Sequence, residues 1–245
     1  MSPRWAFVTG SSQRIGAAIA TNLAARGLHL HLHANASADR LHRLASDLSD
    51  RYGVATRTHL ADFRDPSAVD AMASTIATVG PRPGLLVNNA AVFGQYDYSA
   101  PVELAAMIDI LTVNTAVPIL LTALVDDTDG HVVNICDGHV DLTCSRHLAY
   151  DISKAALADA TRRLAVRLGP NIRVNGIGPG LVLPPPHADE KHLTDLARNA
   201  PLRRPARLED ILSALDFLID SPSVTGQMIM VDSGEHLTCD GEAAH

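Results

Sequence analysis

The segment Trp5-Ala-Phe-Val-Thr-Gly-Ser-Ser-Gln-Arg-Ile-Gly16 decides the fold. Its apolar start is typical of a short buried strand, and its glycines indicate a tight turn into a helix from about Arg14 to Ala25. Gly10 permits the turn, and Gly16 lets the helix lie close to the sheet. The free N–H groups of the first helical turn can bind a pyrophosphate. The segment therefore predicts the opening of a βαβ unit that binds a dinucleotide.

The rest of the chain repeats this alternation. Further strands are expected at 28–33, 54–59, 85–90, 131–135, 171–177 and 228–231. Further helices are expected at 39–51, from 65 onward, at 104–124, from the Tyr150 region to 168, at 188–199 and at 208–219. The pattern predicts an α/β fold over residues 1–245, a single-domain Rossmann-type doubly wound parallel sheet of about seven strands with helices on both faces. The proline-rich segment 181–204 is expected to form a substrate loop or lid.

Composition limits the partners. The net charge of −7 argues against nucleic acid or an anionic membrane as the main partner. No apolar run approaches the length of about 20 residues that spans a bilayer, and the first strand leaves no room for a signal peptide. Cys136, Cys144 and Cys239 have neither a disulfide framework nor metal-ligand spacing. We expect a cytoplasmic protein without a metal site.

Two features favour NADP over NAD. Arg14 occupies the middle glycine position of the usual dinucleotide turn, where it binds a 2′-phosphate or the pyrophosphate, or simply lies in solvent. The segment His33-Ala-Asn-Ala-Ser37 lacks the acidic residue that accepts ribose hydroxyls in NAD sites. Asp62, after the third strand, suits either an adenine amino group or the N-terminus of the next helix. His29, His31 and His33 share one strand face without a further metal-ligand pattern, so we interpret them as strand residues.

Tyr150 and Lys154 lie four residues apart in Tyr-Asp-Ile-Ser-Lys. Residues i and i+4 share one helix face, so the phenol and the ammonium can act together. A free Tyr has a pKa of about 10, and a nearby ammonium lowers it toward neutrality. Lys154 and Lys191 are the only lysines among 20 basic residues, so the chain keeps a lysine where a compact cation is useful. The pair is either an acid–base group or incidental to a surface helix.

Asn114 lies inside an otherwise apolar expected helix that Pro118 interrupts or kinks. An unpaired buried amide is costly, so this side chain either binds backbone at a bend or holds a water.

Together, these motifs resemble the short-chain dehydrogenases/reductases over essentially the whole chain. The ordered set is Thr9-Gly-x3-Arg-Ile-Gly16, Asn88-Asn-Ala90, Asn114, Asp137, Tyr150-x3-Lys154 and Pro179-Gly180. The resemblance implies that Tyr150 exchanges a proton with the substrate, Lys154 binds the nicotinamide ribose and lowers the Tyr150 pKa, and Asn114 holds a relay water. The implied NADPH contacts are Gly10, Ser12, Arg14, Ile15, Gly16, His33, Asn35, Ser37, Asp62, Phe63, Asn89, Ala90, Tyr150, Lys154, Pro179 and Gly180.

Asp137 departs from the family pattern, which has a serine thirteen residues before the tyrosine. A carboxylate repels a developing oxyanion unless it is protonated, but it suits a substrate that presents N–H donors or needs a second protonation. Asp137 is therefore a catalytic residue for a substrate other than a simple ketone, or a helix cap or loop acid without a catalytic role.

Arg14 and Asp137 together resemble the pteridine reductases and dihydromonapterin reductases within the family. The resemblance implies a pterin between the nicotinamide and the Phe93 ring, although Phe93 is equally interpreted as a core or lid aromatic. Hydride would pass to a C=N carbon, with Tyr150 or Asp137 managing the proton on nitrogen. The implied substrate contacts are Arg14, Ala91, Phe93, Asp137, Tyr150 and Leu181. Ala34 and Ala91 depart from the Arg and Ser of the trypanosomatid-type enzymes.

We therefore expect an NADPH-dependent reductase of dihydropterins such as dihydrobiopterin, dihydromonapterin or dihydrofolate. One alternative is a general NADPH-dependent carbonyl or imine reductase. Another is a non-catalytic dinucleotide-sensing regulator, which need not keep Tyr150 and Lys154. The family implies a homotetramer or dimer, with the helix around Asn114 supplying half of one interface. His139, Cys144 and His147 either line the pocket or only pack around it.

Overall fold

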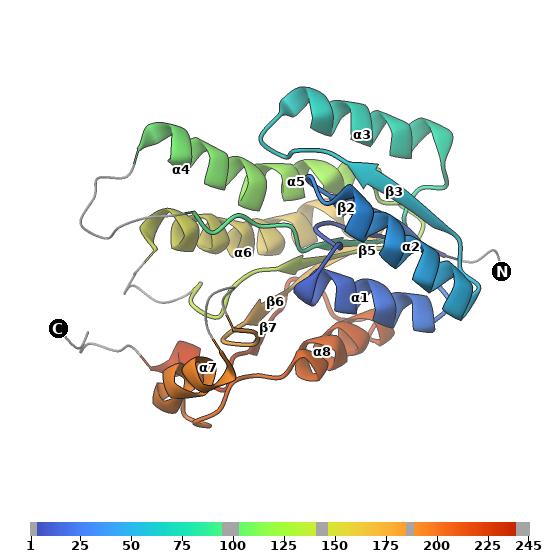
Figure 1. The fold of residues 1–245 in the computed structure, drawn as a ribbon. Helices are drawn as coiled ribbons and strands as arrows, with labels where there is room; N and C mark the ends of the chain where they lie inside the picture. The colour runs from blue at the N-terminus through green and yellow to red at the C-terminus, as the bar shows by residue number, and fades with distance from the viewer. Residues whose placement is uncertain (1–3, 95–102, 141–146, 185–188, 239–245) are drawn as a thin grey trace.

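Seven parallel strands form one sheet in the order β3-β2-β1-β4-β5-β6-β7, so the predicted doubly wound architecture is confirmed (Figure 1). The computed structural model describes residues 4–94, 103–140, 147–184 and 189–238. The strands are β1 (Trp5–Val8), β2 (His29–Ala34), β3 (Thr56–Leu60), β4 (Leu85–Asn88), β5 (Gly130–Ile135), β6 (Ile172–Pro179) and β7 (Met228–Val231).

Helices cover both faces of the sheet (Figure 1). They are α1 (Arg14–Ala25), α2 (Ala38–Tyr52), α3 (Pro66–Val79), α4 (Leu104–Leu111), α5 (Val117–Leu121), α6 (Leu148–Leu168), α7 (Glu190–Leu196) and α8 (Leu208–Asp220), with a π-helical turn η1 (Thr112–Ala116) and 3₁₀ turns η2 (Thr122–Leu124), η3 (Ala197–Asn199) and η4 (Glu235–Leu237). Ala6 and Val8 pack with α1, α2 and α8, whereas Phe7 packs with α3, α5 and α6. Successive side chains of β1 thus enter two different cores, as expected for a strand covered on both faces.

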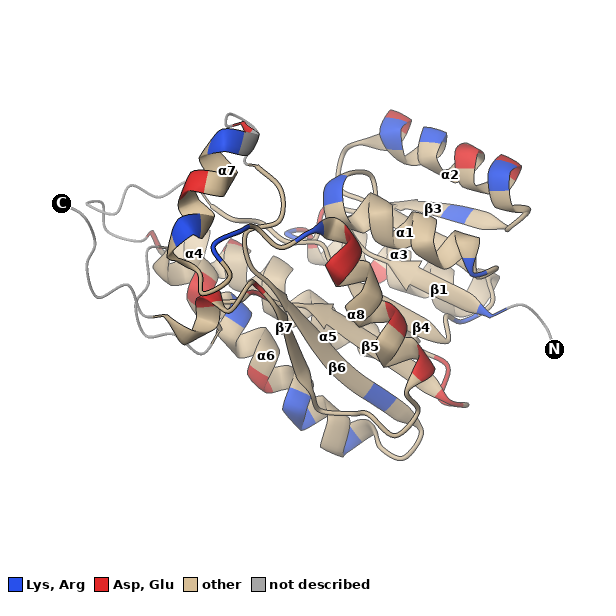
Figure 2. Cartoon of the chain, turned by 90° about the horizontal axis from the view of Figure 1, so that it is seen from below, with Lys and Arg blue, Asp and Glu red and all other residues tan. Residues whose placement is uncertain are grey.

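Charged residues concentrate on the helices and loops, and the strands carry few of them (Figure 2). This distribution explains why the apolar strands were predicted to within a few residues. The expected helix at 188–199 is found as α7 and η3. Residues 185–188 of the expected substrate loop lie outside the described residues.

One expectation about the α4 region was wrong. The elements from Leu104 to Leu124 form a continuous helical run of 21 residues with a mean hydropathy of 1.9, long and apolar enough to cross a membrane by length and composition. The helix itself was expected at 104–124, but the expectation that no apolar run approaches about 20 residues does not hold for it. Val113, Val117 and Leu121 pack in the same core cluster as Phe7. One side of the run therefore packs against the sheet, while Leu104 and Ile108 remain exposed.

The sheet changes its direction of growth between β1 and β4, which are hydrogen-bonded neighbours although they are far apart in sequence. Ligands of doubly wound folds bind at such a switch point, beyond the carboxyl ends of the strands. Thr9 joins the two strand ends, because its Oγ1 accepts the backbone N–H groups of Asn89 and Ala90, both at 3.0 Å. This contact fixes the floor of the candidate site.

Candidate active site

A cleft of about 680 Å³ opens at this switch point. It is lined by every predicted cofactor residue, by Asp137, Tyr150 and Lys154, and by every predicted substrate residue except Leu181. Asn114 and Leu181 lie outside the lining. Further lining residues were not predicted from the sequence, namely Gln13, Ala34, Ala36, Ala61, Val92, Val113, Ile135, Cys136 and Leu183. Most of these are apolar residues with no motif of their own, whereas Gln13 was detectable from its place in the glycine-rich turn.

The glycine-rich turn is closed by direct backbone contact. Gly10 has a φ of +62°, which glycine adopts easily. A Cβ at Gly16 would lie 2.2 Å from the carbonyl oxygen of Gly10 and 2.5 Å from Nδ2 of Asn89. Asn89 Nδ2 donates to the carbonyl oxygens of Thr9 and Gly10, each at 3.0 Å. The N-terminus of α1 is therefore held against the end of β4, where it can take a pyrophosphate.

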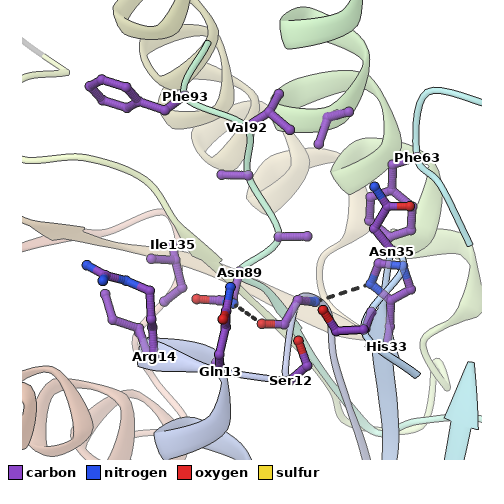
Figure 3. A pocket seen from close by; sticks show the side chains of 18 of the residues that line it. Ser12, Gln13, Arg14, His33, Asn35, Phe63, Asn89, Val92, Phe93 and Ile135 are labelled. Atoms are coloured by element: carbon purple, nitrogen blue, oxygen red, sulfur yellow. Dashed lines mark hydrogen bonds between the residues drawn. The ribbon is translucent and has the colours of Figure 1, made fainter. Parts of the chain in front are cut away.

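Arg14 does more than lie in solvent. Its φ is +53°, and its guanidinium donates to the carbonyl oxygens of Pro184 at 3.1 Å and Leu183 at 3.3 Å. Arg14 thereby ties the glycine-rich turn to the segment after β6, on the side of the cleft where Figure 3 also shows Phe93. Its charge remains near the cleft, so it is available to an anion bound there.

His33 lies at the other end of the cleft, face to face with Phe63 (Figure 3). The two rings are 4.1 Å apart at an angle of 7°. Nδ1 of His33 accepts the N–H of Gly10 at 3.2 Å, and Nε2 bonds to the carbonyl oxygen of Ala61 at 2.9 Å. Burial lowers the pKa of His33 to about 4, so its ring is neutral at pH 7 and brings no positive charge to a phosphate.

The histidines of β2 are engaged in hydrogen bonds. Nδ1 of His31 lies 2.9 Å from Nε2 of His59, and Nε2 of His31 bonds to the carbonyl oxygen of Pro81. Within the described residues, no three His, Cys, Asp or Glu side chains are grouped so that they could hold a metal ion.

Asp62 is not the cap of the next helix. That cap is Asp65, whose carboxylate accepts the N–H of Ser67 at 2.9 Å. Asp62 lines the cleft and pairs with Arg64 at 2.6 Å. Hydrogen bonds from Arg64 hold the pKa of Asp62 below its usual value, so a charged carboxylate faces the adenine end of the proposed cofactor site.

The reactive end of the cleft holds Asp137, Tyr150 and Lys154. The loop after β5 continues to pair with β6, because Gly138 N–H donates to the carbonyl oxygen of Pro179 at 2.8 Å. Asp137 is thereby fixed opposite α6, and its Oδ2 accepts the Tyr150 hydroxyl at 3.1 Å. Nζ of Lys154 donates to the carbonyl oxygen of Ile135 at 2.8 Å and lies 5.8 Å from the centre of the Tyr150 ring. The predicted carboxylate, phenol and ammonium are therefore brought together.

The expected lowering of the Tyr150 pKa by Lys154 was wrong for this arrangement. Burial, followed by the charge of Asp137 and the hydrogen bond to it, raises the pKa of Tyr150 well above its usual value. Burial also lowers the pKa of Lys154. For Asp137, burial favours the protonated form, but hydrogen bonds from His139 and nearby positive charges keep its pKa below the usual value. The group thus pairs a protonated phenol with an ionised carboxylate.

Asn114 binds backbone at a bend, which is one of the two roles left open by the sequence. It lies in the π-helical turn η1 and is fully buried. Its Oδ1 accepts the N–H of Val92 at 2.8 Å, and its Nδ2 donates to the Val92 carbonyl at 2.9 Å and to Oγ of Ser153 at 3.0 Å. Asn114 therefore fixes the segment before Phe93 against α6.

Phe93 is not a core residue, because half of its surface is exposed. Its ring lies 4.6 Å from the Tyr150 ring and 4.3 Å from the His147 ring. It lines the mouth of the cleft together with Ala91 and Val92. A flat ligand that reaches Tyr150 would therefore pass beside the Phe93 ring.

Comparison with known proteins agrees with this geometry. Residues 10–236 match the family model described as enoyl-(acyl carrier protein) reductase. The chain belongs to the short-chain dehydrogenase/reductase family. Membership makes it an oxidoreductase.

Individual members of the short-chain dehydrogenase/reductase family differ in their named substrates. The chain is 33% identical to FolM alternative dihydrofolate reductase 1 of Brucella canis, solved with NADP, with a TM-score of 0.85 and coverage of 99% of this chain and 98% of that one. It is 30% identical to the dihydromonapterin reductase of Citrobacter koseri over 72% of this chain and 76% of that protein. It is 26% identical to the L-sorbose reductase of Gluconobacter frateurii, solved with NADPH and L-sorbose, with a TM-score of 0.87 and 98% coverage of both chains.

Proposed function

We propose that this protein is an NADPH-dependent reductase that converts a dihydropterin into a tetrahydropterin. The observation that carries the proposal is the hydrogen bond from the Tyr150 hydroxyl to Oδ2 of Asp137. An ionised carboxylate at this position repels the oxyanion of a ketone reduction but attracts the N–H groups of a pterin. Two relatives named for pterin or folate reduction, at 33% and 30% identity, support the same substrate class.

The proposed cofactor fits the cleft. The close contact between Gly16 and Gly10 holds the N-terminus of α1 at the cleft, where the first-turn N–H groups of a helix can bind a pyrophosphate. No acidic side chain lies between His33 and Ser37, so a 2′-phosphate meets no negative charge there. Arg14 adds a positive charge at the rim of the cleft. Bound NADPH would supply the hydride.

The chain's own residues would then manage the proton. Tyr150 is protonated at neutral pH, so it can donate its proton to a substrate nitrogen. The ionised Asp137 accepts a hydrogen bond from Tyr150 or from a substrate N–H. Phe93, exposed at the mouth of the cleft, offers a ring face to a planar ligand.

The second candidate is a general carbonyl or imine reductase. It is supported by the likeness to L-sorbose reductase, which has the TM-score of 0.87 given above. A non-catalytic sensor of dinucleotides is disfavoured, because Tyr150 and Lys154 both line the cleft and a sensor would not need this acid–base pair.

We further propose a cytoplasmic homotetramer or dimer, with no nucleic-acid or membrane partner. Leu104 and Ile108 of α4 and Leu148 and Ile152 of α6 are exposed, with Leu104 at 75%. These apolar side chains can pack against the same surface of a second copy.

Light scattering after size exclusion should give a mass above that of one chain, and Ile108→Glu should lower it. An unchanged monomeric mass in both proteins would contradict the proposal.

The decisive experiment follows NADPH oxidation with dihydrobiopterin, dihydromonapterin and dihydrofolate beside a panel of ketones and sugars. A dihydropterin should be turned over, and Tyr150→Phe should remove that turnover by removing the proton donor. Tyr52→Phe, the same change at the C-terminal end of α2 and outside the cleft lining, should have no effect. Ketone turnover without pterin turnover would instead establish the carbonyl reductase.

A further inference from the structure

Asp137 is held from its far side by a second pair of residues. While Oδ2 of Asp137 accepts the Tyr150 hydroxyl, Oδ1 accepts both the backbone N–H and Nδ1 of His139, each at 2.9 Å. Nε2 of His139 lies 3.2 Å from Oε1 of Glu235. The four side chains form an unbroken chain of contacts, Tyr150–Asp137–His139–Glu235, that leads from the reactive phenol away from the cleft.

Glu235 comes from a distant part of the sequence, the η4 turn after β7. A Cβ at Gly180 would lie 2.7 Å from Cβ of Asp232 and 2.9 Å from Oε2 of Glu235, so only a glycine lets this segment approach. Gly138 likewise faces Asp232, with 3.1 Å to a built Cβ. The segment after β7 is therefore seated directly against both loops that frame the reactive end.

Hydrogen bonds within the segment keep Glu235 in place. Asp232 is 4% exposed, and its carboxylate accepts the N–H of Gly234 at 3.0 Å and both the N–H and Nδ1 of His236 at 2.7 Å. The N–H of Glu235 donates to the carbonyl oxygen of Asp232 at 3.1 Å. Glu235 thus belongs to an ordered turn, so less conformational entropy is lost when its carboxylate contacts His139.

The charges along the chain alternate. Hydrogen bonds to Asp137 and Glu235 raise the pKa of His139 to about 10, so its imidazolium lies between two carboxylates. The other titratable groups around Asp137 are Lys154 and Tyr150 on α6 and the adjacent Cys136, whose pKa burial raises to about 12. A lone buried carboxylate becomes protonated, whereas a cation that binds one of its oxygens keeps it ionised and fixes its rotation.

We propose that His139 and Glu235 are positioning residues that keep the Asp137 carboxylate ionised and turned toward Tyr150. Their value for turnover rests on the proposed function, since they act on the substrate only through Asp137. Neither residue belongs to the Asn114, Asp137, Tyr150 and Lys154 set that the sequence indicated.

The first test measures the charge of His139 without any substrate. The full-length protein is labelled at histidine Cε1 with ¹³C, and the signal of His139 among the 12 histidines is assigned by its loss in His139→Gln. In the wild type this signal should remain that of an imidazolium from pH 6 to pH 8.5. Glu235→Gln should lower the titration midpoint by about one pH unit or more, whereas Glu209→Gln, the same change at an exposed site on α8, should leave it unchanged. A wild-type midpoint near 6.5, or no shift in Glu235→Gln, would overturn the proposal.

The second test measures pH profiles with whichever substrate the enzyme reduces, pterin or ketone. His139→Gln and Glu235→Gln should shift the acid limb of kcat upward by about one pH unit, because Asp137 protonates more easily, while KM for NADPH stays the same. If His139 and Glu235 only stabilise the fold, the variants should have a lower Tm but an unchanged acid limb of kcat. Variants with wild-type kcat and an unchanged acid limb would reject the proposed positioning role. If ketones rather than pterins are reduced, the proposed function fails, but both tests still decide the role of His139.

Discussion

The Tyr150 hydroxyl lies 3.1 Å from Oδ2 of Asp137, so the proton of the proposed acid is directed at a carboxylate. Burial, followed by the charge of this carboxylate and its hydrogen bond, raises the pKa of the phenol well above its usual value. Tyr150 is therefore suited to giving up a proton only when a substrate replaces Asp137 as its acceptor. This links proton transfer to the occupation of the cleft.

Asp137→Ser should change the substrate preference. The hydroxyl replaces a repelling charge with a donor for a carbonyl oxygen, so the ratio of pterin to ketone kcat/KM should fall by about 100-fold, the typical value of one acid–base or oxyanion interaction. Steady-state assays with both substrate classes measure this ratio. Asp137→Asn, which removes the charge without adding a small hydroxyl, should lower pterin turnover without improving ketones. An unchanged ratio in Asp137→Ser would show that the carboxylate does not select the substrate.

Asn35→Asp should reverse the cofactor preference. Asn35 lines the cleft just after β2, where a carboxylate would repel a 2′-phosphate and accept the ribose hydroxyls of NADH. Repulsion at this range is on the order of 3 kcal/mol, so kcat/KM for NADPH should fall by about 100-fold relative to NADH. Asn35→Ala separates the loss of the amide from the gain of charge. Equal preference in the wild type would contradict the NADPH assignment.

Gly16→Ala should destabilise the fold by packing alone. Its φ is ordinary, but the new Cβ would lie 2.2 Å from the carbonyl oxygen of Gly10, which is rigid backbone. Overpacking of this kind costs about 1–3 kcal/mol, and we expect the upper end of that range. Urea unfolding gives the free energy change. Gly27→Ala is the comparison, because Gly27 has a φ of +80° with no neighbour within 4 Å, and should cost only the strain of about 1–2 kcal/mol. A smaller loss at Gly16 would mean that α1 can move away from Gly10.

Stability should decrease in acid through the buried histidines. Burial lowers the pKa of His33 to about 4 and that of His131 to about 3. The unfolded chain takes up these protons near pH 6.5, so their contribution is complete above that pH and is lost as the pH falls through the folded values. The free energy of unfolding should fall by up to about 1.4 kcal/mol per pH unit for each histidine.

Urea titrations between pH 7 and pH 4.5 measure that slope. His131→Gln should make it shallower, because one proton uptake by the unfolded chain disappears. His42→Gln, on the exposed side of α2, should leave it unchanged. An identical slope in the wild type and His131→Gln would exclude His131 as a source of acid sensitivity.

The fold was predictable from sequence because short strands, most of them apolar, alternate with helical segments along the chain. The end of β1 at Val8 and the turn at Gly10 follow directly from local residue types. The helical run over 104–124 was also predicted with the correct length, although Asn114 and Pro118 look like helix breakers in sequence. In the structure, the π-helical turn gives Asn114 partners on Val92 and Ser153, so the helix continues through it.

The residues of the candidate site were predictable where they belong to a sequence motif. Properties that depend on tertiary contacts were not predictable. The motifs placed Tyr150, Lys154 and Asp137 in one cleft, but spacing along a helix could not give the state of the Tyr150 proton. That state depends on burial and on the Asp137 carboxylate, which is contributed by a different element. Glu235 was not identified at all, since nothing in its local sequence shows that it reaches His139.

The contact of Thr9 with Asn89 and Ala90 also has a kinetic consequence. The two halves of the cleft floor are about 80 positions apart in the chain, so they meet only after β2, β3 and the intervening helices have been brought together. Closing so long a loop is slow compared with helix formation. On refolding from urea, the far-ultraviolet signal of the helices should therefore return before the ability to bind a dinucleotide, so newly collapsed chains would pass through a helical stage without cofactor affinity.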